Sequence, residues 1–178
     1  MAIAFVVEDG TGLTNATSYI SVADANGIVD TYGRAWSSDA TTKDKQQALN
    51  AGTQYVDARF HELWQSYRTT EGQALDWPRY GVVDIDDWEI ADDVIPDKLK
   101  QAVVEVAVYF DINGKVFPDA DNSGTLKREK IKIDVLEFEE EYLGGSSGSD
   151  VSTKVDDLLK DYIGGASGGG MNSPVARG

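Results

Sequence analysis

The sequence contains no cysteine, which excludes disulfide bonds and thiolate metal sites. It also has no apolar run approaching the roughly 20 residues that a membrane span needs. The N-terminus lacks the basic, apolar and small-residue layout of a signal peptide. We therefore expect a soluble protein that is intracellular when it is made and that has no membrane partner.

Basic side chains are scarce, with 16 Lys and Arg against 31 Asp and Glu, so the formal net charge is -15. A surface of this sign repels nucleic acid as a whole, although it leaves room for a local basic patch. The chain has 178 residues, of which 41% are hydrophobic and 10% aromatic. These values predict one ordinary folded domain with a core.

Residues with catalytic potential are not grouped. No motif pairs a nucleophile with a base, and nothing places two of the many carboxylates in one pocket, so we expect neither an enzyme nor a cofactor. His61, the only histidine, is interpreted as a favourable cation near a helix C-terminus, with a catalytic base as the alternative. The stretch Glu8 to Gly12 predicts a turn. A phosphate loop is the alternative, but two acids lie in it and no Gly-Lys-Ser/Thr follows.

Three main helices are predicted at about 21–32, 43–61 and 96–112, from apolar residues at three-and-four spacing. The third is apolar over more than one stripe, so it must be covered on most sides. Pro96 suits its first turn, and Asn113-Gly114 suits a left-handed cap. Gly52, in the middle of the second helix, suggests close approach by another backbone.

The connection from Trp64 to Ile95 is expected to lie flat on the helices, with its tryptophans as anchors. Its acidic residues predict a solvated edge rather than a calcium loop, which would need a glycine for its sharp turn. A second stretch, Asp119 to Gly124, comes closer to a calcium loop. Lys130 stands where that loop requires a bidentate Glu, so a plain turn is favoured there.

Apolar and charged residues alternate from Glu129 to Tyr142, which predicts an extended β-strand arm. The apolar phase slips by one residue after Val135, as a β-bulge or a change of pairing partner would require. Ile3 to Val7 is the one other predicted strand, so part of the arm is expected to pair with a neighbouring subunit. The predicted subunit-interface residues are Ile131, Ile133, Val135, Leu136 and Phe138.

The chain is predicted to divide into a helical core with the β arm, residues 1–143, and a C-terminal part, residues 144–178. This C-terminal part comprises a flexible linker at Gly144 to Ser149, a short amphipathic helix that must dock on something, and a glycine-rich tail. The predicted fold class is therefore mainly α: a compact core of three main helices plus the short C-terminal helix, with an extended β-strand arm and a flexible C-terminal tail.

Several short motifs follow one another in a characteristic order: Val7 to Gly12, Ser18-Tyr19, Leu75-Asp76-Trp77-Pro78-Arg79-Tyr80-Gly81, Ile95-Pro96, Val155-Asp156-Asp157-Leu158-Leu159, and a glycine-rich tail ending in Arg177-Gly178. In this order they resemble the head-tail adaptor proteins of tailed bacteriophages, also called head-completion or connector proteins. One branch of these proteins carries the label DnaT-like single-stranded DNA-binding protein. The resemblance implies a helical core, a dodecameric ring docked beneath the portal, and arms that bind portal and neighbours.

We therefore expect a structural virion protein of the phage neck, present in the host cytoplasm during assembly. Its expected partners are copies of itself, the portal protein, and a downstream tail, tail-terminator or nozzle protein. The genome would pass without tight binding, along a channel for which the candidates are Asp84, Asp86, Asp87, Asp92 and Asp93. The predicted portal-binding residues are Val151, Val155, Leu158, Leu159, Tyr162, Ile163, Val175, Arg177 and Gly178. The alternative function is single-stranded DNA binding, which would need a basic groove with stacking aromatics.

Overall fold

The computed structural model describes residues 4–114, 117 and 147–164. This part of the chain is mainly α, as predicted. Its regular elements are α1 (Val22–Thr31), α2 (Thr42–Phe60), α3 (Asp97–Ile112), α4 (Ser147–Leu159), the short 3-10 helix η2 (Lys160–Tyr162), and two strands of two residues each, β1 (Tyr67–Arg68) and β2 (Arg79–Tyr80). The strands pair antiparallel as a small sheet.

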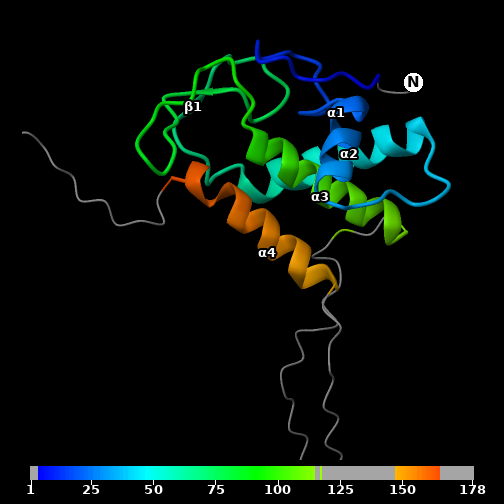
Figure 1. Ribbon diagram of the computed structural model, residues 1–178. Coiled ribbons are helices and arrows are strands. Elements are labelled where there is room, and N and C mark those ends of the chain that lie inside the picture. Colours follow the sequence, from blue (N-terminus) through cyan, green and yellow to red (C-terminus); the bar gives the residue numbers. More distant parts are fainter. Residues whose placement is uncertain (1–3, 115–116, 118–146, 165–178) are drawn as a thin grey trace, which may run out of the picture.

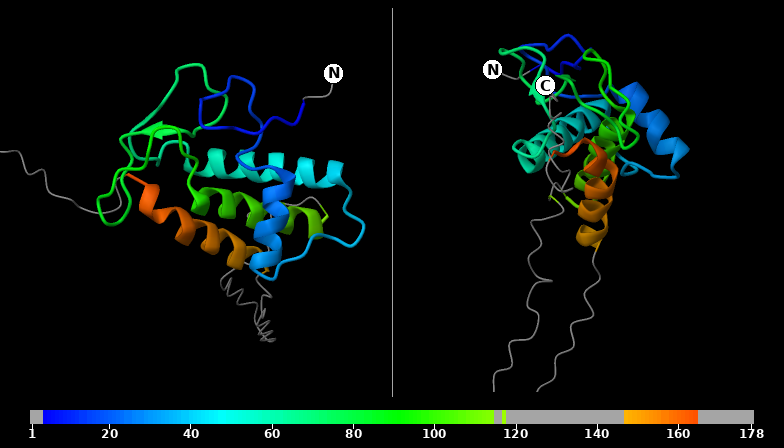
Figure 2. Two further views of the ribbon diagram at one scale, coloured as in Figure 1. Left: turned by 45° about the horizontal axis from the view of Figure 1, so that its top comes forward. Right: turned by 90° about the vertical axis from the view of Figure 1, so that its left-hand side faces the viewer.

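Helix α3 lies at the centre of the fold, between α2 and α4, while α1 crosses beside it (Figures 1 and 2). All three neighbouring helices contact α3, which explains why its apolar residues are not confined to one stripe. The side chains of α3 that are buried are Leu99, Ala102, Val103, Val104, Glu105, Val106, Ala107 and Val108. The predicted coverage of this helix on most sides is confirmed.

The helix ends follow local sequence signals. Ser21, where the first predicted helix was expected to begin, caps α1 by accepting the backbone N-H of Asp24. Thr41 and Asp44 form a complete capping box at the start of α2, which the sequence analysis missed. Pro96 precedes the first residue of α3, and Gly114 follows its end with a φ of 69°, which is the predicted left-handed cap.

Helix α4 begins at Ser147, so the last three residues of the predicted linker, 147–149, are helical. The helix docks on α3 of its own chain, and Val155 and Leu159 are fully buried there. This confirms that the short helix needs a partner to pack against. The predicted β arm, the calcium-like loop and the C-terminal tail lie outside the described residues.

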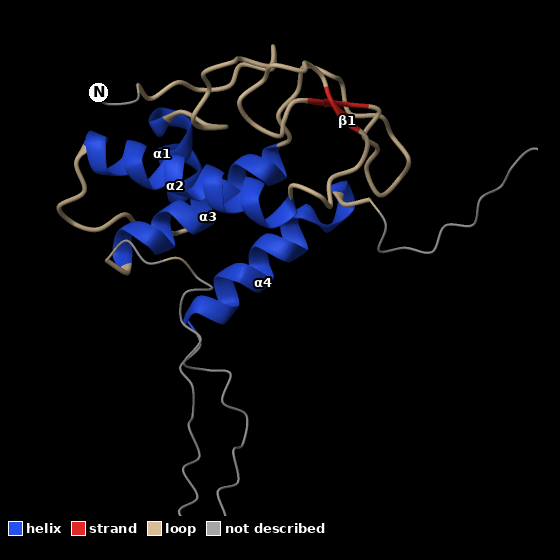
Figure 3. Ribbon diagram, turned by 180° about the vertical axis from the view of Figure 1, so that it is seen from behind, coloured by secondary structure: helices blue, strands red, loops and turns tan. Residues whose placement is uncertain are grey.

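The strand predicted at Ile3 to Val7 is wrong for its described part, because Val7 makes only an isolated parallel bridge to Ser18. The observed strands lie instead in the long connection, which with the N-terminal segment forms a layer of loops over one side of the helices (Figure 3). Two-residue strands carry no detectable alternation of apolar and polar residues, so periodicity could not have found them.

Gly52 marks the closest approach of α2 to α3. A Cβ at this position would lie 2.6 Å from the carbonyl oxygen of Val103 and 3.3 Å from the backbone nitrogen of Ala107. The predicted backbone contact is therefore confirmed. By contrast, a Cβ on Gly27, in the middle of α1, would meet nothing within 4 Å.

These two glycines give a matched test of the α2 and α3 contact. Gly52→Ala is expected to destabilise the protein by about 1–3 kcal/mol, because overpacking outweighs the gain in helix propensity. Gly27→Ala is expected to stabilise it by about 0.5–1 kcal/mol, since only the propensity changes. Urea unfolding followed by circular dichroism measures both, and equal effects of the two substitutions would contradict the close contact.

Candidate interaction surface

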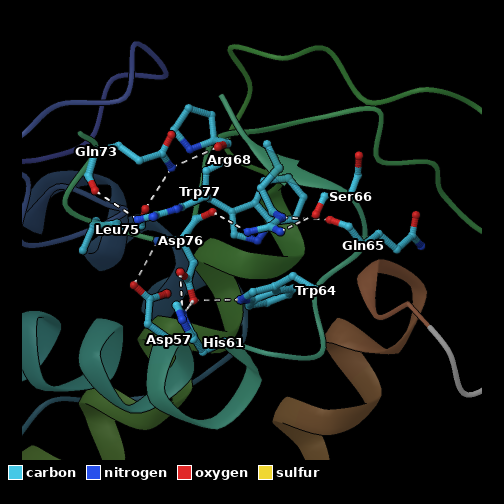
Figure 4. A network of polar contacts seen from close by, with 12 residues as sticks. Asp57, His61, Trp64, Gln65, Ser66, Arg68, Gln73, Leu75, Asp76 and Trp77 are labelled. Atoms are coloured by element: carbon cyan, nitrogen blue, oxygen red, sulfur yellow. Dashed lines mark hydrogen bonds and ion pairs between the residues drawn. The ribbon is translucent and has the colours of Figure 1, made fainter. Parts of the chain in front are cut away.

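A buried polar cluster fixes the long connection to the end of α2 (Figure 4). The Asp57 carboxylate accepts the Tyr19 hydroxyl at 2.6 Å and the backbone N-H of Asp76 at 3.3 Å. The carboxylate of Asp76 lies 2.9 Å from Nδ1 of His61 and accepts the indole N-H of Trp64 at 3.3 Å. His61 is the C-cap residue of α2, as its predicted position near a helix end implied.

Arg79 holds the same connection from within. Its buried guanidinium donates to the carbonyl oxygens of Gln65, Asp76 and Ser66 at 2.8, 3.1 and 2.6 Å. Gln73 adds donors to the carbonyls of Leu75 and Pro78. Three backbone carbonyls thus share one cation, which joins β2 to the residues just before β1 and to the segment between the two strands.

Two of the tryptophans anchor the connection as predicted. Trp77 is fully buried and meets Trp64 edge to face, with ring centroids 5.7 Å apart. The Trp77-Pro78 peptide bond is cis. The prediction is wrong for Trp88, which is 71% exposed. The path of the loop determines this difference, and tryptophan spacing does not reveal that path.

The N-terminal turn provides its own anion. The buried Glu8 carboxylate accepts the backbone N-H groups of Gly10, Gly12 and Leu13 at 3.1, 2.9 and 2.9 Å. The turn prediction is confirmed. A phosphate would need these same backbone donors, and the Glu8 carboxylate already occupies them, which argues against a phosphate loop. A Cβ on Gly10 would lie 1.9 Å from the carbonyl oxygen of Asp93, so the turn also supports the acidic connection.

The most prominent outward feature of the connection is a tight loop at Asp84 to Glu89, here called the Trp88 loop. Backbone hydrogen bonds and an antiparallel bridge between Val83 and Glu89 close it. The Asp84 carboxylate also accepts the backbone N-H groups of Asp86 and Trp88 at 2.9 and 3.0 Å. The loop is therefore ordered by internal bonds, yet it exposes Ile85 by 72% and Trp88 by 71%.

A second exposed aromatic feature lies on the small sheet. Tyr67 and Tyr80 are paired across β1 and β2, and their rings stack with centroids 5.8 Å apart. Both rings are exposed to solvent. Exposed apolar side chains of this size, held on hydrogen-bonded backbone, are typical of binding surfaces.

The predicted channel residues all lie on the connection. Asp86, Asp87, Asp92 and Asp93 are exposed, whereas Asp84 is partly buried because it closes the Trp88 loop. Their place on one surface agrees with the expected solvated edge. Whether they face a channel stays a prediction.

The structure divides the predicted portal-binding residues. Val155, Leu159 and Tyr162 are buried inside this chain, so in this conformation they are core residues and are not available to a partner. Val151 and Leu158 on α4, and Ile163 just after η2, are partly exposed. Val175, Arg177, Gly178 and the predicted subunit-interface residues at 131–138 lie outside the described residues. Their assignment stays a prediction.

Sequence analysis missed one charged cluster that joins the helices. Glu105, buried on α3, forms ion pairs with Arg34 at 3.0 Å and with Lys154 on α4. The carboxylate is thereby paired from both sides of the central helix, as a buried charge requires. A glutamate in a run of valines was the available signal, because only a paired acid is tolerated at such a position.

The described residues contain no group of three His, Asp or Glu placed to hold a metal ion. None of the helices in this part of the chain is long and apolar enough to span a membrane. The surface is hollowed by shallow grooves, and one of about 630 Å³ runs between the end of α2 and η2, beside Phe60, Leu63 and Ile163. The described part of the surface therefore offers open grooves of the kind that suit contacts with a partner.

Asp57 gives the polar cluster a dependence on pH. Burial raises the pKa of its carboxyl from 3.8 to about 7, against the lowering effect of the hydrogen bond from Tyr19. The folded state therefore binds the Asp57 proton more tightly than the unfolded state does. The stabilising contribution is fully present below about pH 4 and is lost as the pH rises through about 7.

We predict that the advantage of the wild type over Asp57→Asn falls by up to about 1 kcal/mol per pH unit between roughly pH 4.5 and 7, then levels off. Urea unfolding of both proteins across this range measures the difference, in which the titration of the other acids cancels. Tyr19→Phe should extend the decline to higher pH, because it removes a donor that lowers the Asp57 pKa. A difference independent of pH would contradict the assignment.

Comparison with known proteins places the chain in a family. A family model described as "Putative DnaT-like ssDNA binding protein" matches residues 3–178. No curated protein and no solved structure matches the chain at a significant level. Because the match spans almost the whole sequence, it covers the helical core, the connection and the C-terminal part alike. The chain therefore belongs to the family of DnaT-like ssDNA-binding proteins.

Proposed function

We propose that this protein is a structural subunit of a phage particle, a ring-forming head-tail adaptor that docks beneath the portal and extends the DNA channel toward the tail. The observation that carries the proposal is the Trp88 loop. Its backbone is closed by hydrogen bonds while Ile85 and Trp88 stand in solvent. Large apolar side chains held in place before binding are typical anchors of protein interfaces.

Charge supports a protein partner for this surface. Four of the six residues of the Trp88 loop are acidic and none is basic. A nucleic-acid phosphate approaching Trp88 would meet these carboxylates, whereas an apolar protein surface with basic neighbours would be attracted. In an adaptor, the surplus of acid would also keep passing DNA from sticking to the channel wall.

The portal contact is proposed for the C-terminal part. Val151, Leu158 and Ile163 keep exposed area on α4 and after η2 while their neighbours pack on α3. The chain continues from Gly164 through a glycine-rich stretch to Val175 and Arg177. Glycines let such a tail enter a narrow cleft, and Arg177 offers a forked donor for a carboxylate at its end.

Single-stranded DNA binding is the second candidate, favoured by the description of the family. The stacked pair of Tyr67 and Tyr80 is the described feature that fits it, because exposed aromatic rings can stack on bases. The run Lys127 to Lys132 supplies four basic residues in the sequence. The net charge of -15 argues against this candidate. The two proposals therefore make opposite predictions for the affinity of the protein for single-stranded DNA.

A gel-shift titration of the full-length chain with a single-stranded oligonucleotide separates them. At about 50 mM salt the adaptor proposal predicts no tight complex, because the surface potential repels the phosphates. Tight binding that weakens steeply with salt and is lost in Tyr67→Ala/Tyr80→Ala would establish the second candidate instead. Tyr32→Ala, at another exposed tyrosine, is the matched control.

Deleting Ser173 to Gly178 is expected to leave a folded protein that no longer joins the portal complex. Co-sedimentation with assembled portal measures the loss, and circular dichroism checks the fold. Arg177→Ala should weaken binding in the same direction, since it removes the charged donor alone. Electron microscopy of the wild-type complex is expected to show a ring. Portal binding unchanged by the deletion would refute the tail assignment, and a single subunit per particle would refute the ring.

A further inference from the structure

Two peptide bonds of this chain join an asparagine to a glycine, at Asn26-Gly27 and at Asn113-Gly114. An asparagine in this position readily loses its side-chain amide, because the glycine has no Cβ to hinder attack by its own backbone nitrogen. By sequence the two sites are equivalent. The structure places them in opposite surroundings, so any difference in their reactivity is set by the fold.

Asn26 lies in the middle of α1 and is held by both its side chain and its backbone. Its amide oxygen accepts the indole N-H of Trp36 at 3.0 Å and the ammonium group of Lys45 at 3.1 Å. The turn that follows buries Val29 in the core. A change of backbone conformation at Asn26 would therefore break helical hydrogen bonds and move Val29 out of the core.

Asn113 follows the last residue of α3, where the backbone is easier to rearrange. Both Asn113 and Gly114 are exposed, and a Cβ on Gly114 would meet nothing within 4 Å. Asn113 donates its backbone N-H and its side-chain N-H to the carbonyl oxygen of Tyr109, each at 2.9 Å. Both bonds belong to the final turn of the helix, which opens at a far smaller cost than the middle of a packed helix.

The reaction needs this freedom to move. The backbone nitrogen of Gly114 attacks Cγ of Asn113, and the bond between Cγ and Nδ2 breaks. Ammonia leaves with the proton of the attacking amide, and a cyclic succinimide remains until water opens it at either carbonyl, giving aspartate or isoaspartate. At the observed ψ of 29° the Gly114 nitrogen points away from the Asn113 side chain, so the helix end must turn before the new bond can form.

We propose that Asn113 is a site of spontaneous modification, at which the folded protein loses the side-chain amide and forms aspartate and isoaspartate. Asn26 keeps its amide because α1 holds it in place. This assignment depends on the two helix positions alone and is independent of the proposed adaptor function.

The modification weakens the end of α3. It places a negative charge at the helix C-terminus, where the helix dipole is already negative, and it removes the side-chain donor to the Tyr109 carbonyl. Isoaspartate also lengthens the backbone by one carbon. This happens just before the chain turns back to bring the Phe117 ring within 5.0 Å of the Phe110 ring.

Peptide mapping tests the proposal, because trypsin leaves the two sites on different peptides, residues 1–34 and 101–115. Full-length protein is incubated in mildly alkaline buffer, once folded and once in guanidinium chloride. After removal of the denaturant, a short digestion at mildly acidic pH limits further reaction, since the attacking amide must give up its proton. Mass spectrometry then measures the fraction of each amide that has been replaced, and fragmentation separates Asn26 from Asn15.

In the folded protein Asn113 is expected to lose its amide at least about tenfold faster than Asn26, because helix ends open far more often than packed helix interiors. In guanidinium chloride the two rates should converge, since both asparagines precede glycine. Equal rates in the folded protein would overturn the proposal. It is also overturned if Asn113 keeps its amide in the folded protein while it reacts in guanidinium chloride.

The effect on α3 is tested with Asn113→Asp, which reproduces one of the two products. This variant is expected to unfold at a lower urea concentration than wild type, as measured by circular dichroism. The matched control is Asn15→Asp, which adds the same charge at an exposed position outside the described helices. A midpoint that Asn113→Asp lowers no further than Asn15→Asp does would overturn the predicted weakening of the helix end.

Discussion

Burial of α3 is the constraint on which the rest of the structure depends. A helix with apolar residues on nearly every side cannot be left in water, and three other helices are needed to cover it. The close approach of α2 at Gly52 and the docking of α4 through Val155 and Leu159 are two consequences. The one buried charge on α3, Glu105, is compensated by Arg34 and by Lys154 of α4. The segments that cover the helix therefore also supply the cations that pair with its charge.

Polar groups, in contrast, determine the shape of the loop layer. The partners of Asp57, Asp76 and Arg79 are backbone groups, a tyrosine, a histidine and a tryptophan. Each bond ties the long connection to a helix or to itself. The result is an irregular segment closed by internal hydrogen bonds that exposes Ile85 and Trp88 to solvent.

This separation of roles is an argument for the proposed assembly function. The helical core buries most of the large apolar side chains. These include Val155 and Leu159 of α4, a helix whose apolar face was expected to bind a partner. Among the described residues, most of the large apolar side chains that stay exposed lie on the connection, at Tyr67, Tyr80, Ile85, Trp88 and Val94, while Tyr32, Leu63 and Ile112 lie beside helix ends. An acidic surface with a few large apolar side chains suits contacts between proteins. It is less suited to the DNA binding that the family description names.

The sequence by itself determined the features that depend on local spacing. Three-and-four periodicity located α1, α2 and α3, Pro96 and Asn113-Gly114 located the ends of α3, and Gly52 indicated a backbone contact, because each signal lies within one or two helical turns. Only the tertiary structure decided which tryptophan is buried, that Glu8 fills its own turn, and that Arg79 and Glu105 hold distant segments. These outcomes depend on partners tens of residues away, and one residue's spacing from its neighbours carries no information about such a partner until the chain has packed.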